Sequence, residues 1–121
     1  MNTKEKGRLG ERLAEDYLQK NNYKIREKNY YTRWGEIDIV AEDEGSGEVV
    51  FVEVKMRNSN TCGYPEEAVD ERKVEKMALA AENYLEKKEE QCDYRFDCLA
   101  IVGDLASRKA TIKHYKNIGL S

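Results

Sequence analysis

The sequence has too few of several residue types to support some common kinds of site. Its 121 residues include one histidine, one proline, one tryptophan and three cysteines. The lone histidine, His114, is a poor basis for nucleophile–histidine or histidine–metal chemistry, so we do not expect it to be catalytic. Cys62, Cys92 and Cys98 are odd in number and lack Cys-x-x-Cys spacing, which favours reduced thiols over a structural zinc site. Chemistry must therefore use carboxylates, lysine, arginine or tyrosine.

Long apolar segments are also absent. No run approaches the ~20 apolar residues that a membrane-spanning helix needs. The segment from Met1 to Tyr17 lacks the apolar core of a secretory signal. We therefore expect a cytoplasmic protein without membrane contact, folded as a single domain over residues 1–121 with one core.

The charge balance leaves nucleic-acid binding open. Charged residues make up 37% of the chain, and 21 basic against 24 acidic residues give a net charge of −3. A strongly basic domain is the usual sign of a nucleic-acid binder. A nuclease, however, gathers carboxylates around its metal and can concentrate basic residues near that site.

Hydrophobic periodicity predicts two helices and five strands. Leu9, Leu13 and Tyr17 recur every four residues, with Ala14 and Leu18 beside them, which predicts a helix from Lys4 to Lys20. The other expected elements are strands at Tyr23–Tyr31, Glu36–Ala41 and Glu48–Arg57, a helix at Glu66–Glu90, and strands at Tyr94–Val102 and Ala110–Tyr115. This order predicts an α/β fold with a mixed central sheet flanked by helices.

The hairpin of Glu36–Ala41 and Glu48–Arg57 carries the most informative pattern. If its loop is centred between Gly45 and Ser46, facing residues have numbers that add up to 91. Asp38 then faces Glu53, and Glu36 faces Lys55. Alternation places Glu36, Asp38, Glu53, Lys55 and Arg57 on one face, and Ile37, Ile39, Val52 and Val54 on the core face.

Facing carboxylates indicate a cation site. Asp38 and Glu53 repel each other across the sheet, and a raised pKa or a bound cation relieves that repulsion. Oxygen ligands suit Mg²⁺ or Mn²⁺. Lys55, on the same face, can orient a water or neutralise charge that develops on a phosphate. An ordinary polar face with a Glu36–Lys55 ion pair explains the hairpin pattern equally well.

The first helix adds a further carboxylate to this pattern. Glu11 lies at the edge of the apolar stripe, beside Ala14 and Leu18. From such a boundary it can supply a third oxygen ligand, directly or through water. The alternative is a solvent-facing residue that pairs with Arg8 or a nearby lysine.

With Glu11, Asp38 and Glu53-Val54-Lys55 identified, the chain resembles the PD-(D/E)xK, or restriction-endonuclease-like, superfamily. It is most similar to the small bacterial YraN-like family, which is related to the Holliday junction resolvases. Ile37 stands where the superfamily's name has proline. The segments that carry the resemblance include Gly10-Glu11, Gly35–Ala41, Phe51–Arg57, Ala80-Ala81 and Arg95–Asp97.

The resemblance implies an α-β-β-β-α-β core and a role for each site residue. Asp38 and Glu53 are expected to bind Mg²⁺ or Mn²⁺, Lys55 to be the catalytic lysine, and Glu11 to be an auxiliary ligand or water-orienting acid. The implied activity is metal-dependent phosphodiester hydrolysis on DNA rather than RNA, including branched or junction DNA. We also expect a homodimer, because junction resolvases cut paired strands from two active sites.

A second class of function stays open on the sequence alone. The chain can instead be a non-catalytic module that keeps the nuclease fold and binds nucleic acid or protein. Candidate nucleic-acid contacts are Arg8, Arg33, Arg57 and Lys73, although each also fits a solvated charged surface. Tyr30, Tyr31 and Trp34 can either stack on bases or pack within the protein.

Overall fold

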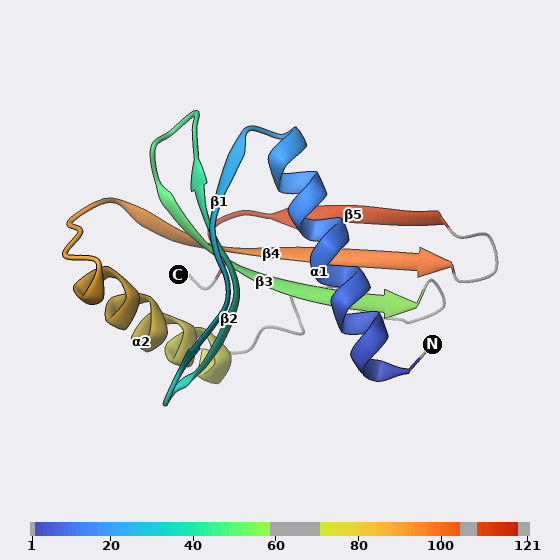
Figure 1. The fold of residues 1–121 in the computed structure, drawn as a ribbon, viewed down its shortest axis with the longest axis horizontal. Coiled ribbons are helices and arrows are strands. Elements are labelled where there is room, and N and C mark those ends of the chain that lie inside the picture. Colours follow the sequence, from blue (N-terminus) through green and yellow to red (C-terminus); the bar gives the residue numbers. More distant parts are fainter. Residues whose placement is uncertain (1, 59–70, 105–108, 119–121) are drawn as a thin grey trace.

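A computed structural model of the chain describes residues 2–58, 71–104 and 109–118. The side chains of Thr3, Arg57, Asn58, Glu71 and Asp104 lie outside that description. No helix in the described ranges is long and apolar enough to span a membrane. The elements are α1 (Thr3–Lys20), β1 (Tyr23–Thr32), β2 (Gly35–Asp43), β3 (Val49–Asn58), α2 (Glu71–Lys87), β4 (Tyr94–Asp104) and β5 (Lys109–Tyr115) (Figure 1).

The five strands form one mixed sheet in the order β1-β2-β3-β4-β5. β3 and β4 are parallel, and α2 lies between them in the chain, while the other neighbouring pairs are antiparallel. β5 is an edge strand and carries the exposed lysines Lys109 and Lys113. The expected α/β fold class is confirmed, and the arrangement is consistent with a restriction-endonuclease-like core.

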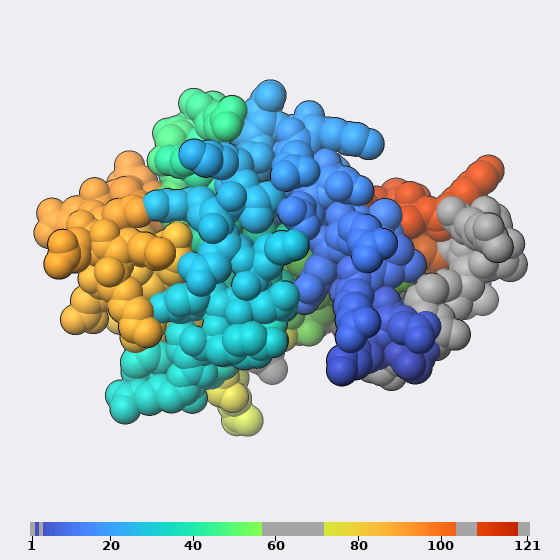
Figure 2. Space-filling view, in the orientation of Figure 1, coloured from blue at the N-terminus to red at the C-terminus, as the bar shows by residue number. Residues whose placement is uncertain are grey.

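The two helices cover opposite faces of the sheet. α1 crosses over β3, β4 and β5, and α2 runs beside the bent β1–β2 hairpin (Figure 1). In the same orientation, Figure 2 shows that α1 and the β1–β2 hairpin fill much of the near surface. The sheet therefore has a buried core on each face.

Each face has its own apolar cluster. Ala14 and Leu18 of α1 pack with Val50 and Val52 on one face. Alternate residues of the same strand, Val49 and Phe51, pack with Met77, Ala81 and Tyr84 of α2 on the other.

The expectation of a single core face is therefore wrong. Ile39 and Val52 do belong to the α1 cluster, and Val54 packs against it. Ile37, which was assigned to the same face, packs in the α2 cluster. A sheet covered on both faces buries side chains on both sides of a strand. Ile37 also lies where β2 no longer pairs with β3, so the alternation of the paired segment does not decide which cluster it joins.

Residues next to the two ends of α1 determine where the helix begins and stops. The Asn2 side chain caps the helix by accepting a hydrogen bond from the Glu5 N–H at 2.8 Å. The expected stop at Asn21-Asn22 is confirmed, and Asn22 has a φ of 66°. A Cβ at Gly10 would lie 3.4 Å from the sulfur of Met56, at van der Waals contact distance, so α1 packs directly against the side chains of β3 here.

A buried ion-pair network fixes the end of the sheet where β3 and β4 begin. Arg95, which is 5% exposed, binds the fully buried Asp97 at 3.0 Å. Its guanidinium also donates to Asp43 at 3.0 Å, to Glu48 at 2.9 Å and to the Tyr23 hydroxyl at 2.8 Å. One arginine therefore joins β1, β2 and β4 with the turn before β3.

The histidine contacts the buried network, and two of the cysteines are free thiols. His114 Nε2 lies 2.7 Å from an Asp97 carboxylate oxygen, within the same network. Cys92 and Cys98 are free thiols. Burial raises the pKa of the Cys98 thiol to about 11, which leaves it unreactive near neutral pH. Cys62 lies outside the described residues.

Candidate active site

The site begins where β2 and β3 separate. Their ladder runs from Glu42–Val49 to Ile39–Val52, so the expected register is confirmed. Past this point, within the described part of both strands, β2 pairs with β1 while β3 continues along β4. The expected facing pairs Asp38–Glu53 and Glu36–Lys55 are therefore not formed, because the ladder ends before it reaches them.

Asp38 lies in the opening between the two strands. Its Oδ2 accepts a hydrogen bond from the Val54 N–H at 2.8 Å, in place of a backbone acceptor from β2. This bond fixes the position of the carboxylate against β3. The second carboxylate oxygen remains to face other groups in the opening.

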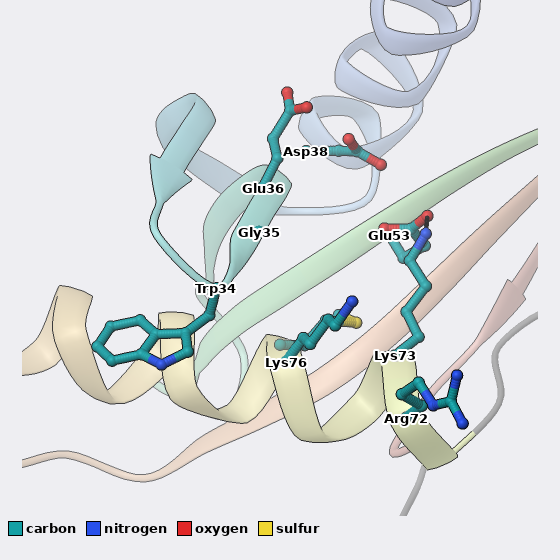
Figure 3. A pocket seen from close by; sticks show the side chains of 9 residues that line it. Trp34, Gly35, Glu36, Asp38, Glu53, Arg72, Lys73 and Lys76 are labelled. Atoms are coloured by element: carbon teal, nitrogen blue, oxygen red, sulfur yellow. Dashed lines mark hydrogen bonds and ion pairs between the residues drawn. The ribbon is translucent and has the colours of Figure 1, made fainter.

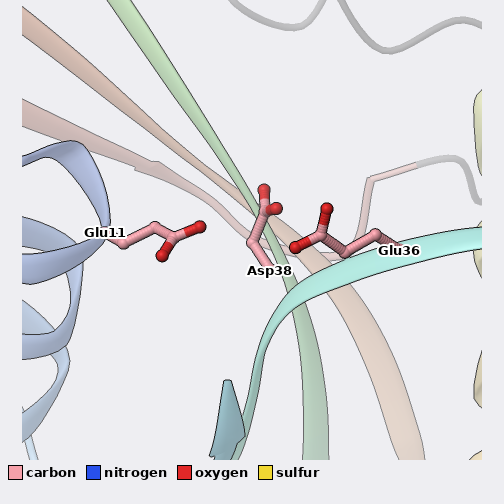
Figure 4. A group of neighbouring side chains, drawn as sticks. All are labelled: Glu11, Glu36 and Asp38. Carbon is pink, nitrogen blue, oxygen red and sulfur yellow. The ribbon is translucent and has the colours of Figure 1, made fainter. Parts of the chain in front are cut away.

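Three carboxylates meet there. Single oxygens of Glu11, Glu36 and Asp38 all lie within 4.8 Å of one another. Figure 4 shows Glu11 reaching from α1 toward Asp38, while Glu36 extends from β2 on the other side. The Asn29 amide donates to Glu11 at 3.2 Å. Sequence reasoning placed Glu36 on the same face as Asp38 but did not recognise it as a ligand, although the Glu-x-Asp spacing on one strand indicates it.

The electrostatics of this group favour a proton or a cation. Burial, together with the nearby Glu53 carboxylate, raises the pKa of Asp38 to about 7, despite the hydrogen bond from Val54. Burial also raises the pKa of Glu36, with Glu11 and Glu53 adding to the effect. Without a cation and below about pH 7, Asp38 therefore keeps a proton that an exposed aspartate would lose.

Glu53 is paired with two lysines. It is 4% exposed, and its Oε1 lies 3.1 Å from Lys55 Nζ and 2.5 Å from Lys73 Nζ. Although burial alone would lower it, the pKa of Lys73 is raised by the hydrogen bond to Glu53. Glu53, which was expected to be a metal ligand, thus lies outside the close group of Glu11, Glu36 and Asp38 and pairs with Lys55 and Lys73.

Two cavities meet at Asp38. The larger, of about 440 Å³, opens toward α2. A smaller one, of about 190 Å³, lies toward α1 and includes Glu11. Asp38 lines both cavities. The larger cavity is lined by Trp34, Gly35, Glu36, Asp38, Glu53, Arg72, Lys73, Lys76 and Met77 (Figure 3).

The expected nucleic-acid contacts fall in different places. Lys73 lines the larger cavity, and the guanidinium of Arg33 lies 4.5 Å from the centre of the Trp34 ring at the same cavity. Arg8 is exposed on α1. The Arg57 side chain lies outside the description. The structure thus brings Lys73 to the cavity that Asp38 lines, while Arg33 lies beside Trp34.

The donor set at the opening fits a hard divalent cation. Mg²⁺ takes oxygen ligands at about 2.1 Å in an octahedron, so neighbouring ligands lie about 3.0 Å apart and opposite ligands about 4.2 Å apart. The three carboxylate oxygens lie within 4.8 Å of one another, so they would move closer together to bind one ion as neighbouring ligands. Glu11, Glu36 and Asp38 are the residues that would hold Mg²⁺ or Mn²⁺.

Comparison with known sequences places this site within a family. A profile described as "Uncharacterised protein family UPF0102" matches residues 10–101. The chain belongs to this family. The matched range includes Glu11, Glu36, Asp38, Glu53 and Lys55, and membership confirms the resemblance to the YraN-like proteins.

UPF0102 relatives align over nearly their full length. A UPF0102 protein of Fusobacterium nucleatum is 46% identical over 106 residues, covering 86% of this chain and 87% of the relative. A UPF0102 protein of Persephonella marina is 42% identical over 113 residues, covering 93% of this chain and 90% of the relative. A UPF0102 protein of Clostridioides difficile is 43% identical over 102 residues, covering 84% of this chain and 88% of the relative.

Proposed function

We propose that this UPF0102 protein is a divalent-metal-dependent nuclease of the PD-(D/E)xK superfamily that hydrolyses phosphodiester bonds in DNA. The observation that carries the proposal is the placement of Asp38. Its carboxylate lies between two cavities, within 4.8 Å of oxygens from Glu11 and Glu36. The resemblance to junction resolvases supports DNA, including branched DNA, as the substrate.

Crowded carboxylates are better suited to binding metal than to binding phosphate directly. Glu11, Glu36 and Asp38 repel one another when all are ionised, and burial of Asp38 increases that cost. A divalent cation removes the repulsion and lets all three act as anionic ligands. A surface that only docked DNA would gain nothing from three carboxylates beside the phosphates.

The neighbouring lysines supply the positive charge that hydrolysis needs. When bound, the cation would polarise a phosphoryl oxygen and activate water. The Lys55 ammonium lies 3.1 Å from Glu53, which lines the same cavity as Asp38. Its role is to neutralise negative charge that builds on the phosphate oxygens in the transition state. Glu53 acts as the positioning residue for Lys55 and Lys73.

A cleavage assay with a lysine variant tests this proposal. Lys55→Met keeps most of the side-chain length and removes the ammonium, so we expect the cleavage rate to fall at least ~100-fold. The matched control is Lys87→Met, at the far end of α2, because Lys73 itself contacts Glu53. Duplex, single-stranded, flapped and four-way DNA are offered alongside RNA, in Mn²⁺ and then Mg²⁺.

The same assay can reject the nuclease assignment. Cleavage that is lost in Lys55→Met and kept in Lys87→Met supports it. If the protein cuts none of these substrates but binds one of them equally well after Lys55→Met, the non-catalytic binding module is correct. Calorimetry adds an independent measurement, because Mn²⁺ should bind the wild type and fail to bind Asp38→Ala.

A further inference from the structure

The larger cavity has an aromatic end and two polar walls. Trp34 lies at one end and Arg72 toward the other, with Glu36, Asp38 and Glu53 along the sheet side (Figure 3). Arg72, Lys73 and Lys76 come from the first two turns of α2. At about 440 Å³ the cavity is within the ~300–1,000 Å³ range of small-molecule sites. That volume has room for one nucleotide unit.

The turn that carries Trp34 is fixed by local bonds. The Thr32 hydroxyl donates to the Gly35 carbonyl at 2.9 Å and accepts from the Trp34 N–H at 3.1 Å. Gly35 has a φ of 147°, which favours glycine at this position. The Arg33 guanidinium lies over the indole at 4.5 Å, so a cation accompanies the aromatic ring. These bonds therefore fix the backbone that carries Trp34, whose side chain lines the cavity.

Two exposed cations of α2 lie opposite the acidic wall. Arg72 and Lys76 line the cavity and are exposed. Neither forms an ion pair with a carboxylate in the described ranges, whereas Lys73 binds Glu53. Unpaired cations that face a metal-type site are suited to phosphate oxygens. They could hold the backbone of a strand whose base reaches Trp34.

We infer that the cavity takes an unpaired nucleotide, so that the substrate is a single-stranded segment or end rather than a continuous duplex. This inference rests on the proposed function and specifies its substrate class. The base stacks on Trp34, and the neighbouring phosphates bind Arg72 and Lys76. Stacking on an aromatic side chain tolerates any base, because every base has a π-face.

The sole tryptophan of the chain reports directly on this contact. The wild-type protein, in EDTA to prevent cleavage, is titrated with single-stranded oligothymidylate and with a blunt duplex of equal length. We expect the single strand to quench the Trp34 emission to saturation and to bind at least ~10-fold more tightly than the duplex. Unchanged emission, or equal affinity for both forms, overturns the inference.

Variants locate the contact, with binding followed by the anisotropy of a labelled strand. Trp34→Ala should weaken single-strand binding roughly 10- to 100-fold, and Trp34→Phe should recover part of the loss. Lys76→Gln should weaken binding and reduce its salt dependence. Lys87→Gln, on the same helix away from the cavity, is the charge-matched control and should bind as the wild type does. Equal effects of Lys76→Gln and Lys87→Gln contradict a specific phosphate contact.

The inference and the proposed function fail in different ways. Suppose that metal-dependent duplex cleavage persists in Trp34→Ala and is lost in Lys55→Met. This result supports the nuclease function and rejects the inference that the cavity binds an unpaired nucleotide. Single-strand binding that quenches Trp34, without cleavage in Mn²⁺ or Mg²⁺, rejects the nuclease and keeps the cavity as a nucleotide site.

Discussion

Replacing Asp38 by asparagine separates the charge of this residue from its hydrogen bond. Asparagine keeps a side-chain oxygen that can accept the Val54 N–H, now 2.8 Å from Asp38 Oδ2, and removes the ionisable group. The local backbone should therefore be preserved. What changes is the cost of holding a negative charge in a buried group of carboxylates.

The size of the effect follows from the pKa of Asp38. Its ordinary value is 3.8, and burial with the Glu53 charge raises it to about 7 in the folded protein. The folded state thus binds this proton more tightly than the unfolded chain does. The contribution of this proton to the free energy of unfolding is fully present below pH ~4 and is lost as the pH rises to about 7. At 1.36 kcal/mol per pH unit, wild type should lose about 3 kcal/mol relative to Asp38→Asn between pH 5 and pH 8.

Urea unfolding in EDTA at pH 5, 6, 7 and 8 measures this difference. Asp16→Asn, which removes an exposed carboxylate from α1, serves as the control and should show no comparable trend. A stability difference between wild type and Asp38→Asn that stays constant within ~0.5 kcal/mol across this range would refute the reasoning. Mn²⁺ at 100 times its dissociation constant should restore about 2.7 kcal/mol to wild type and nothing to the variant.

Two further predictions concern the rest of the molecule. Arg95→Met should lower the free energy of unfolding by about 3–5 kcal/mol in urea titrations, because it leaves the fully buried Asp97 without its main cation; a loss below ~1 kcal/mol would contradict that role. A two-fold homodimer should give twice the 14.1 kDa chain mass in light scattering, and a monomer mass at high concentration would remove the support for paired cleavage.

Local patterns predicted most of the fold. The four-residue spacing of Leu9, Leu13 and Tyr17 predicted Lys4–Lys20, and α1 spans Thr3–Lys20. The second helix was expected at Glu66–Glu90 and is described as Glu71–Lys87, with residues 66–70 outside the description. The hairpin register was predicted because a short loop fixes it within one contiguous segment.

The parts that failed depend on contacts distant in sequence. Nothing in Gly35–Asn58 indicates that β2 is separate from β3 on the N-terminal side of Ile39, where β3 continues in parallel along β4. Glu36 therefore joined Asp38 and Glu11 instead of facing Lys55. Lys73 was expected as a surface contact, and only the packing of α2 against the sheet brings it to Glu53.

The lysines of the edge strand β5 restrict how two copies of this chain can associate. An exposed edge offers unpaired backbone groups to another strand, and charged side chains are a common defence against such pairing. Lys109 and Lys113 are four residues apart and thus share a face of β5. Two β5 strands joined about a two-fold axis normal to the sheet would bring four ammonium groups onto one face of a ten-stranded sheet. That repulsion disfavours sheet extension and fibre growth through β5, so the homodimer that the resemblance implies would use another surface.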